Sequence, residues 1–275
     1  MKKLEAPNFD DLDILRDMSG EGNPLYRRWN LIESIRGAYG NYDVQRGNGH
    51  QIGAAVSITD SAKFAILSCV KNWSGPLGVF EDIRFNLSPD VCPMCGSFST
   101  TSIDHVIPKE LYPEFSFYSK NLVPACSCNS KKLLNFIGSP NERVLHPYFD
   151  EVLRKRLIVS SFGRPLDSMT ISVVVAPDLD ELQSEVIFHI DKLIKNERIA
   201  GYFSCEFKKI WTLPDHYFNN VQTLTFDIMK VELERKLHRL DEEYGTKNNW
   251  KSALYSGILL DEEVLRYIFN KLQNI

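Results

Sequence analysis

Three neighbouring stretches decide how this chain is interpreted: Cys92-Pro-Met-Cys95, Asp104-His-Val-Ile-Pro-Lys109 and Asn121-Leu-Val-Pro-Ala-Cys-Ser-Cys-Asn-Ser-Lys-Lys132. Together they place an Asp-His pair between two close pairs of cysteines. Two thiolates separated by two residues can chelate one tetrahedral ion, and a second close pair completes a structural four-cysteine site. Closely paired cysteines outside a secreted scaffold favour a metal over a disulfide. The block therefore predicts a loop held shut by a metal ion.

The second cysteine pair differs from the first, because only one residue separates its members. This spacing tightens the chelate and removes one amide that would otherwise point at a sulfur. Zinc is the predicted ion, and unliganded thiols and a redox role remain the alternatives. The other two cysteines, Cys69 and Cys205, stand alone in apolar surroundings, and we expect both to be buried and inert. The predicted zinc ligands are Cys92, Cys95, Cys126 and Cys128.

The Asp104-His105 pair lies inside this loop. On an extended strand, adjacent side chains point to opposite faces, so one can face a metal and the other a substrate water. A histidine with a pKa near neutrality is a suitable general base. A carboxylate oxygen is a suitable ligand for Mg²⁺ or Mn²⁺. An isolated Asp-His pair is usually only structural, and its position within the cysteine loop is what gives it weight.

In this order, the motifs resemble those of the HNH endonucleases over residues 92–132. The resemblance implies a ββα-metal fold braced by zinc on four cysteines. It makes His105 the general base. It makes Asn121 the residue that holds the loop so that the histidine is oriented. Asp104 and Asn129 would then bind the catalytic metal. The family usually has two residues between the cysteines of the second pair, so the place of Cys126 in the site needs testing.

The residue types of these motifs also suit phosphodiester hydrolysis on chemical grounds that do not depend on the family resemblance. The reaction needs an activated water, neutralised phosphate charge and help for the leaving oxygen, and one hard cation, Mg²⁺ or Mn²⁺, can supply the last two. Lys109 and Lys132 lie beside the motif and can contact backbone phosphates, although a solvated surface is an equal alternative for them.

Two further stretches extend the resemblance weakly. Leu145-His-Pro-Tyr-Phe-Asp150 and Asn249-Trp-Lys-Ser-Ala-Leu-Tyr255 are similar to segments of HNH proteins from bacterial anti-phage defence systems, some of which act with an ATPase subunit. The resemblance implies a role in antiviral defence and an ATPase partner. His146 is more simply interpreted as a packed structural histidine than as a site residue.

Composition limits how this protein could bind nucleic acid or a membrane. The chain has 275 residues, of which 43% are apolar and 25% charged, with a net charge of −4. A protein that binds nucleic acid by bulk charge is usually basic, so any such contact must come from a local patch or a metal. The apolar stretches are too short to span a membrane, and no apolar segment follows the first lysines. We therefore expect a cytoplasmic protein without membrane contact.

The predicted fold class is α+β, in three parts. Residues 1–90 form a helical region, residues 91–150 the HNH module, and residues 151–275 a mixed, mainly helical region. Asn23-Pro24 predicts a helix start, Gly37 and Gly40 its end, and Thr59 or Asp60 the next cap. Strands are expected near 156–160, 169–175 and 186–190, and helices over 215–243, 248–258 and 261–272.

The function predicted from the sequence is a metal-dependent endonuclease acting on nucleic acid, with DNA as the first expectation and RNA as an alternative. One rival is a zinc-braced binding module without catalysis, against which the joint presence of Asp104, His105, Asn121 and Asn129 speaks. Another is an effector subunit that stays silent until a partner such as an ATPase releases it.

Overall fold

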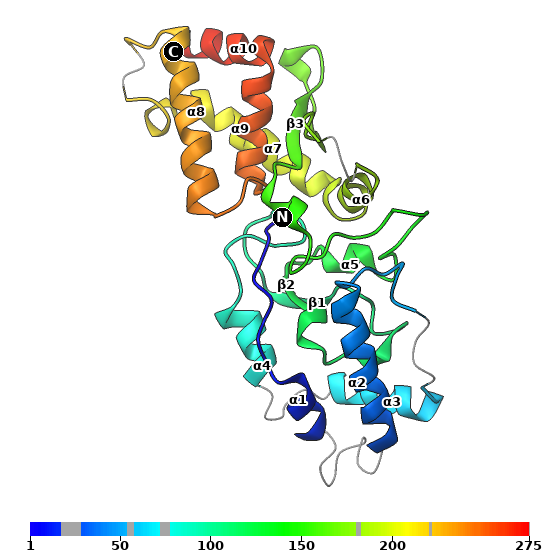
Figure 1. Ribbon diagram of the computed structural model, residues 1–275. Helices are drawn as coiled ribbons and strands as arrows, with labels where there is room; N and C mark the ends of the chain where they lie inside the picture. The colour runs from blue at the N-terminus through cyan, green and yellow to red at the C-terminus, as the bar shows by residue number, and fades with distance from the viewer. Residues whose placement is uncertain (18–28, 54–57, 72–77, 180–182, 220–221, 275) are drawn as a thin grey trace.

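The computed structural model describes residues 1–17, 29–53, 58–71, 78–179, 183–219 and 222–274. The chain is an α+β protein drawn out into two lobes, with the first residue at their junction (Figure 1). The lower lobe of that view holds the N-terminal helices and the first sheet. The upper lobe holds the second sheet and the C-terminal helices. Each sheet consists of two antiparallel strands.

The N-terminal helices are α1 (Asp11–Asp17), α2 (Trp29–Val44), α3 (Asp60–Lys71) and α4 (Gly78–Glu81), followed by a π-helical turn, Asp82–Asn86. The α3 helix begins at one of the two expected positions. The helix start expected at Asn23-Pro24 lies outside the described residues.

The expected end of α2 at Gly37 and Gly40 is wrong, because the helix continues through both glycines to Val44. The reason is packing. Ile35, Tyr39 and Tyr42 follow one another at helical spacing and are at most 5% exposed. Burial of that stripe outweighs the roughly 1 kcal/mol by which each glycine disfavours a helix.

The first sheet lies at the centre of the N-terminal lobe. Strands β1 (Ser102–His105) and β2 (Leu122–Ala125) pair antiparallel, with Ser102 opposite Ala125 and His105 opposite Leu122. Residues 106–121 connect them through two 3₁₀ turns, and the short helix α5 (Asn129–Lys132) follows β2. The module thus has the order strand, strand, helix.

The C-terminal lobe contains a second hairpin packed against helices. Its strands are β3 (Ile158–Phe162) and β4 (Ile171–Val175), close to the expected positions. The strand expected over 186–190 is wrong: this segment is α6 (Gln183–His189), which continues into a π-helical turn, Ile190–Ile194. Its buried residues Val186, Ile190 and Leu193 recur at helical and not at strand spacing.

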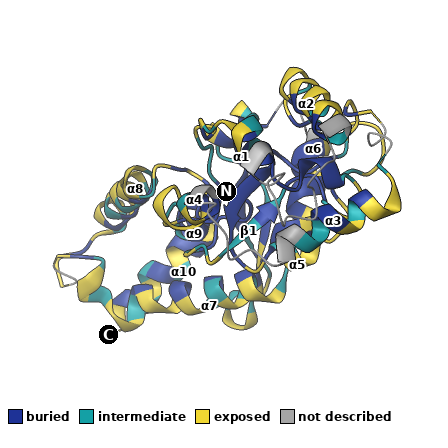
Figure 2. Ribbon diagram, turned by 90° about the horizontal axis from the view of Figure 1, so that it is seen from below, coloured by how far each residue is buried: buried dark blue, intermediate teal, exposed yellow. Residues whose placement is uncertain are grey.

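Four longer helices complete the lobe. They are α7 (Glu197–Thr212), α8 (Phe226–Glu243), α9 (Trp250–Leu260) and α10 (Glu262–Gln273). The expected cap at Asp261 is confirmed, since its side chain accepts a hydrogen bond from the Val264 amide. Helix α8 starts later than expected and leaves much of its surface exposed (Figure 2). The apolar side chains of Ile228 and Val231 on this helix face outward and are 49% and 41% exposed.

The α9 helix packs directly on β3. A Cβ atom added at Gly257 would lie 2.1 Å from the Ser160 carbonyl oxygen, so only glycine allows this approach. The Ser160 hydroxyl donates to the Leu254 carbonyl at 3.0 Å. The helix and strand thus form the centre of the C-terminal lobe.

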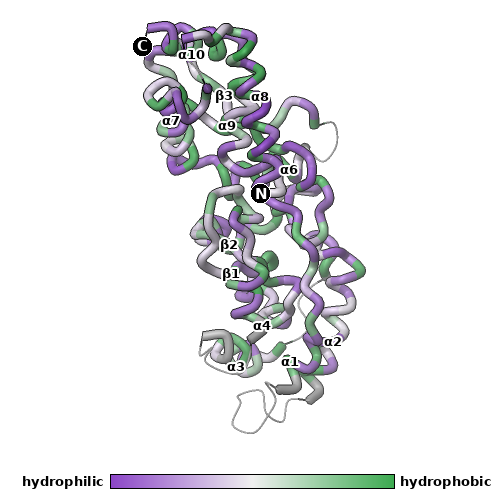
Figure 3. The backbone as a smooth tube through the Cα atoms, turned by 90° about the vertical axis from the view of Figure 1, so that its left-hand side faces the viewer, coloured by the Kyte–Doolittle hydropathy of each residue, from purple (hydrophilic) through white to green (hydrophobic). Residues whose placement is uncertain are grey.

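Hydrophilic and hydrophobic stretches are interspersed along the backbone in both lobes (Figure 3). Among the described residues, no helix has the length and apolar character needed to cross a membrane.

Candidate metal centre and adjoining polar site

The four predicted zinc ligands come together in one buried cluster. Their sulfur atoms all lie within 4.8 Å of one another. The Cys92–Cys128 sulfur distance is 3.7 Å, and the Cys95–Cys126 distance is 3.5 Å. With Zn–S bonds of about 2.3 Å, a tetrahedral site has sulfur–sulfur edges of about 3.8 Å. The cluster therefore fits a four-cysteine zinc ion.

The short second pair does not exclude Cys126 from the cluster. The Cys126 sulfur accepts hydrogen bonds from the Cys128 amide at 3.3 Å and from the Ser97 hydroxyl at 3.2 Å. Hydrogen bonds from the thiols of Cys128 and Cys92 hold the Cys126 pKa well below its usual value. A sulfur that is easily deprotonated and has several donors is a suitable metal ligand.

The C-terminal lobe holds the turn that carries the first cysteine pair. Gly96 has φ = +81°, which closes this turn, and its amide donates to the Cys92 carbonyl at 2.9 Å. The indole of Trp250 donates to the Cys95 carbonyl at 2.8 Å, and Nε2 of His189 contacts the Met94 carbonyl at 2.6 Å. The cluster thus lies where the two lobes meet.

The two remaining cysteines were expected to be buried. For Cys205 this is wrong, because it is exposed on α7. Its helix buries the face formed by Ile199, Phe203, Phe207 and Ile210, and Cys205 lies away from that stripe. The side chain of Cys69 lies outside the described residues.

His105, at the end of β1, is held by one ring nitrogen. Its Nε2 lies 3.0 Å from the Ser116 carbonyl oxygen. Since a carbonyl can only accept, Nε2 carries the proton and Nδ1 keeps its lone pair. Burial of the ring, followed by the charge of Lys109, lowers the His105 pKa to about 3. No group of the described residues forms a hydrogen bond to Nδ1, which is available to accept a proton.

Asn121 is fully buried at the other end of the connection between β1 and β2. Its Oδ1 accepts from the Ile107 amide at 2.8 Å. Its Nδ2 donates to the carbonyls of Ile107 and Phe115 at 3.0 and 3.2 Å. Phe115 precedes the residue whose carbonyl holds His105. Asn121 thus joins the start of the connecting loop to the part that contacts the histidine.

Asp104 has a partner that the sequence did not indicate. The Lys132 ammonium lies 2.8 Å from its carboxylate and is 2% exposed. The same ammonium donates to the carbonyls of His105 and Val106. This placement differs from the expectation that Lys132 faces a phosphate, because its charge is used inside the module.

Asn129 lies over the same face of β1 as Asp104. Its side-chain amide contacts the Ser102 hydroxyl at 3.3 Å, and Ser102 is two residues before Asp104 on the strand. Alternate strand residues share a face. Asn129 and Lys132 are three residues apart on α5, so the helix sets one over Ser102 and the other over Asp104.

The second predicted phosphate ligand, Lys109, is partly exposed. Its ammonium lies 2.9 Å from the Glu110 carboxylate. Its charge contributes to the lowered His105 pKa. Lys109 is therefore close to the histidine and accessible, in contrast to Lys132.

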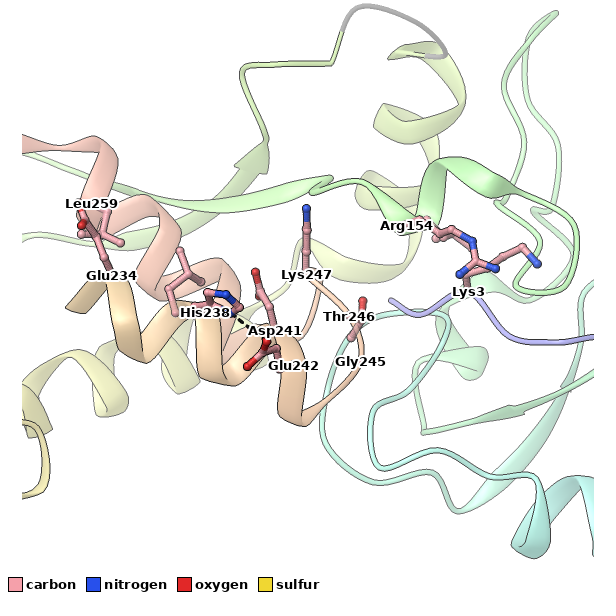
Figure 4. Close-up of a pocket in the computed structure, with 12 residues that line it drawn as sticks. Lys3, Arg154, Glu234, His238, Asp241, Glu242, Gly245, Thr246, Lys247 and Leu259 are labelled. Carbon is pink, nitrogen blue, oxygen red and sulfur yellow. Dashed lines mark ion pairs between the residues drawn. The ribbon is translucent and has the colours of Figure 1, made fainter. Parts of the chain in front are cut away.

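A cavity of about 590 Å³ lies elsewhere, between α8 and the chain near the N-terminus. Figure 4 shows Lys3 and Arg154 on one side and residues of α8 on the other. None of the predicted site residues lines it. Several of its charged groups have partners: Lys3 and Arg154 with Glu151, Asp241 with Arg156, and His238 with Glu242.

Comparison with known proteins shows a similarity to a phage protein. The chain is 27% identical over 209 residues to protein ea31 of Escherichia phage lambda, an alignment that covers 70% of this chain and 69% of that protein. No protein-family model and no solved structure matches the chain.

Proposed function

We propose that this protein is a metal-dependent endonuclease of the HNH type that hydrolyses phosphodiester bonds in nucleic acid, with DNA as its substrate. The observation that carries the proposal is the environment of His105. Its Nε2 donates to a backbone carbonyl, and its Nδ1 is unprotonated and has no hydrogen bond from the described residues. The ring is neutral at pH 7, and the negative charge of a bound phosphate would raise its pKa from about 3 toward the range in which it takes a proton from water.

The oxygen ligands beside it suit a hard cation. The Asp104 carboxylate and the carbonyls of His105 and Val106 already surround one positive charge, the Lys132 ammonium. Such oxygen-rich sites are what Mg²⁺ and Mn²⁺ prefer. Asp104 and Asn129 would hold the ion, which would supply charge neutralisation at the phosphate and at the leaving oxygen.

The division of roles within the chain follows. His105 accepts the proton of the attacking water, and Lys109, which is accessible, meets a backbone phosphate. In the structure the Lys132 ammonium contacts one oxygen of the Asp104 carboxylate, and we infer that a divalent cation binds there in its place. The four cysteines, with zinc, brace the module from the side where the C-terminal lobe packs.

A second candidate is a nuclease that is inactive until a partner, such as an ATPase in an anti-phage system, releases it. The observation in its favour is the Asp104–Lys132 ion pair, since activity would depend on its opening. The similar protein ea31 is encoded by a phage. A role of the same nuclease chemistry in the phage life cycle is therefore as well supported as a role in anti-phage defence.

The test is direct. Purified, zinc-loaded protein is incubated with plasmid, linear DNA and total RNA in the presence of Mg²⁺, Mn²⁺ or EDTA. The proposal predicts cleavage of DNA that EDTA abolishes. Activity that appears only when a partner subunit is added would support the second candidate. Binding of DNA without cleavage in either setting would support a binding module instead.

A further inference from the structure

We infer that Tyr42, on α2, is a positioning residue for the histidine of the site, acting through Asn121. This helix lies outside the segment that resembles HNH endonucleases. The activity measurement below rests on the proposed function, whereas the spectroscopic one does not.

The hydroxyl of Tyr42 lies between two fully buried side chains. It donates to Oδ1 of Asn121 at 2.9 Å and lies 2.9 Å from Nε2 of His146. Nδ1 of His146 accepts from the Tyr148 amide at 3.2 Å, so Nε2 carries the proton and donates to the tyrosine oxygen. Burial lowers the His146 pKa to about 3, which keeps the ring neutral. With Nε2 of His146 protonated, the Tyr42 hydroxyl donates to Asn121 and not to the histidine.

Tyr42 completes the hydrogen bonding of Asn121. The amide oxygen has two donors, Tyr42 and the Ile107 amide, and the amide nitrogen has two acceptors, the carbonyls of Ile107 and Phe115. All positions of this buried amide are then satisfied. Because two donors face one end and two acceptors the other, the amide cannot rotate without losing hydrogen bonds.

The side-chain amide of Asn121 holds the loop whose Ser116 carbonyl accepts the hydrogen bond from His105. Nδ2 of Asn121 binds the Phe115 carbonyl, and the next carbonyl, that of Ser116, accepts from Nε2 of His105. A shift of the loop at Phe115 therefore moves the acceptor of the histidine. Displacement of a reacting group by about 1 Å can reduce a rate about 100-fold.

The same helix offers a matched control. Tyr39 is 5% exposed and its ring stacks on Tyr118 with centroids 4.1 Å apart. Its hydroxyl is buried and has no hydrogen-bond partner among the described residues. Tyr39→Phe and Tyr42→Phe each remove one buried hydroxyl from α2, and only the second removes a hydrogen bond to Asn121.

The experiment compares wild type, Tyr42→Phe and Tyr39→Phe as zinc-loaded full-length proteins. Long-range ¹H–¹⁵N spectra report the tautomer of His105, whose signals are assigned by their loss in His105→Gln. We expect a single Nε2–H tautomer in wild type and Tyr39→Phe, and shifted or mixed nitrogen signals in Tyr42→Phe. On plasmid DNA, kcat should fall about 10- to 100-fold in Tyr42→Phe with KM nearly unchanged.

Identical His105 signals in the two tyrosine variants would overturn the inference. If none of the proteins cleaves nucleic acid, the proposed function fails, and the nitrogen spectra still decide the role of Tyr42. His146→Gln tests the other end of the hydrogen-bonded chain. It should shift the His105 signals less than Tyr42→Phe does, because the tyrosine hydroxyl can still donate to Asn121, and a larger shift would contradict the proposed order.

Discussion

Replacement of Lys132 by methionine tests the most unexpected contact of the site. The substitution keeps an unbranched side chain and removes the ammonium. The Asp104 carboxylate, whose side chain is 10% exposed, then loses its ion-pair partner. The carbonyls of His105 and Val106 also lose a donor. Removal of one member of a buried ion pair typically lowers the free energy of unfolding by about 3–5 kcal/mol.

The matched control is Lys131→Met, because Lys131 is exposed on the same short helix. A surface substitution of this kind should change the free energy of unfolding by less than about 0.5 kcal/mol. The assay is urea unfolding of the zinc-loaded proteins, followed by tryptophan fluorescence, with and without MgCl₂.

Addition of Mg²⁺ tests a second property of the Lys132→Met variant, namely whether Asp104 binds a divalent cation. If Asp104 is a metal ligand, the cation can replace the missing ammonium in Lys132→Met. At a concentration about 100 times the Kd, a bound ligand stabilises the folded state by about 2.7 kcal/mol. Wild type should gain less, because the cation must displace Lys132. Equal stability of the two lysine variants would refute the importance of the ion pair, and a Lys132→Met variant that ignores Mg²⁺ and Mn²⁺ would refute Asp104 as a metal ligand.

Three further outcomes are expected. Cys95→Ser should reduce zinc content and solubility because structural zinc contributes directly to folding, and elemental analysis that finds no zinc in folded wild type would reject the site. Asn129→Ala should raise the Mg²⁺ concentration needed for cleavage while zinc content stays unchanged; cleavage that persists in EDTA would contradict this. Burial lowers the pKa of His105 and His146 to about 3 and of His189 to about 4, so the unfolded state binds protons first as the pH falls below its value of about 6.5. Acidification from about pH 7 to pH 5 should then cost about 2 kcal/mol of unfolding free energy per histidine, partly offset by Asp11, whose pKa burial raises to about 6. Urea titrations at both pH values measure the difference, and unchanged stability would contradict the lowered pKa values of these buried rings.

The parts of the site that the sequence predicted depend on residues close together in the chain. The cysteine pairs are separated by one or two residues, and the Asp-His pair is adjacent. Short spacings of this kind limit the geometry strongly. The clustering of all four sulfur atoms followed from them, including Cys126, which the unusual spacing had left open.

The parts that were missed depend on contacts between distant residues. Tyr42 reaches Asn121 across 79 residues, and Trp250 reaches Cys95 across 155. Nothing in the sequence around Tyr42 marks it as part of the site, and the resemblance around Trp250 does not indicate a contact with Cys95. The sequence predicts Lys132 as a phosphate contact or a solvated side chain, and only the path of α5 across β1 shows that its charge is buried against Asp104.

The errors in secondary structure have a similar cause. The glycines of α2 were expected to end the helix, but the buried stripe of Ile35, Tyr39 and Tyr42 continues across them. The apolar run at Val186 was too short for its period to be distinguished without the residues that follow it. Both errors arise because tertiary packing outweighs local preference.

The central claim is that His105 is the general base of a nuclease. The most direct measurement is the rate of plasmid cleavage by His105→Ala, with melting temperature and zinc content measured on the same samples. His238→Ala, which alters an exposed histidine on α8, is the control. We predict that His105→Ala loses about 10²–10⁴-fold in rate while retaining its zinc, its DNA binding and a melting temperature close to that of wild type. Cleavage by His105→Ala at the wild-type rate would contradict the claim.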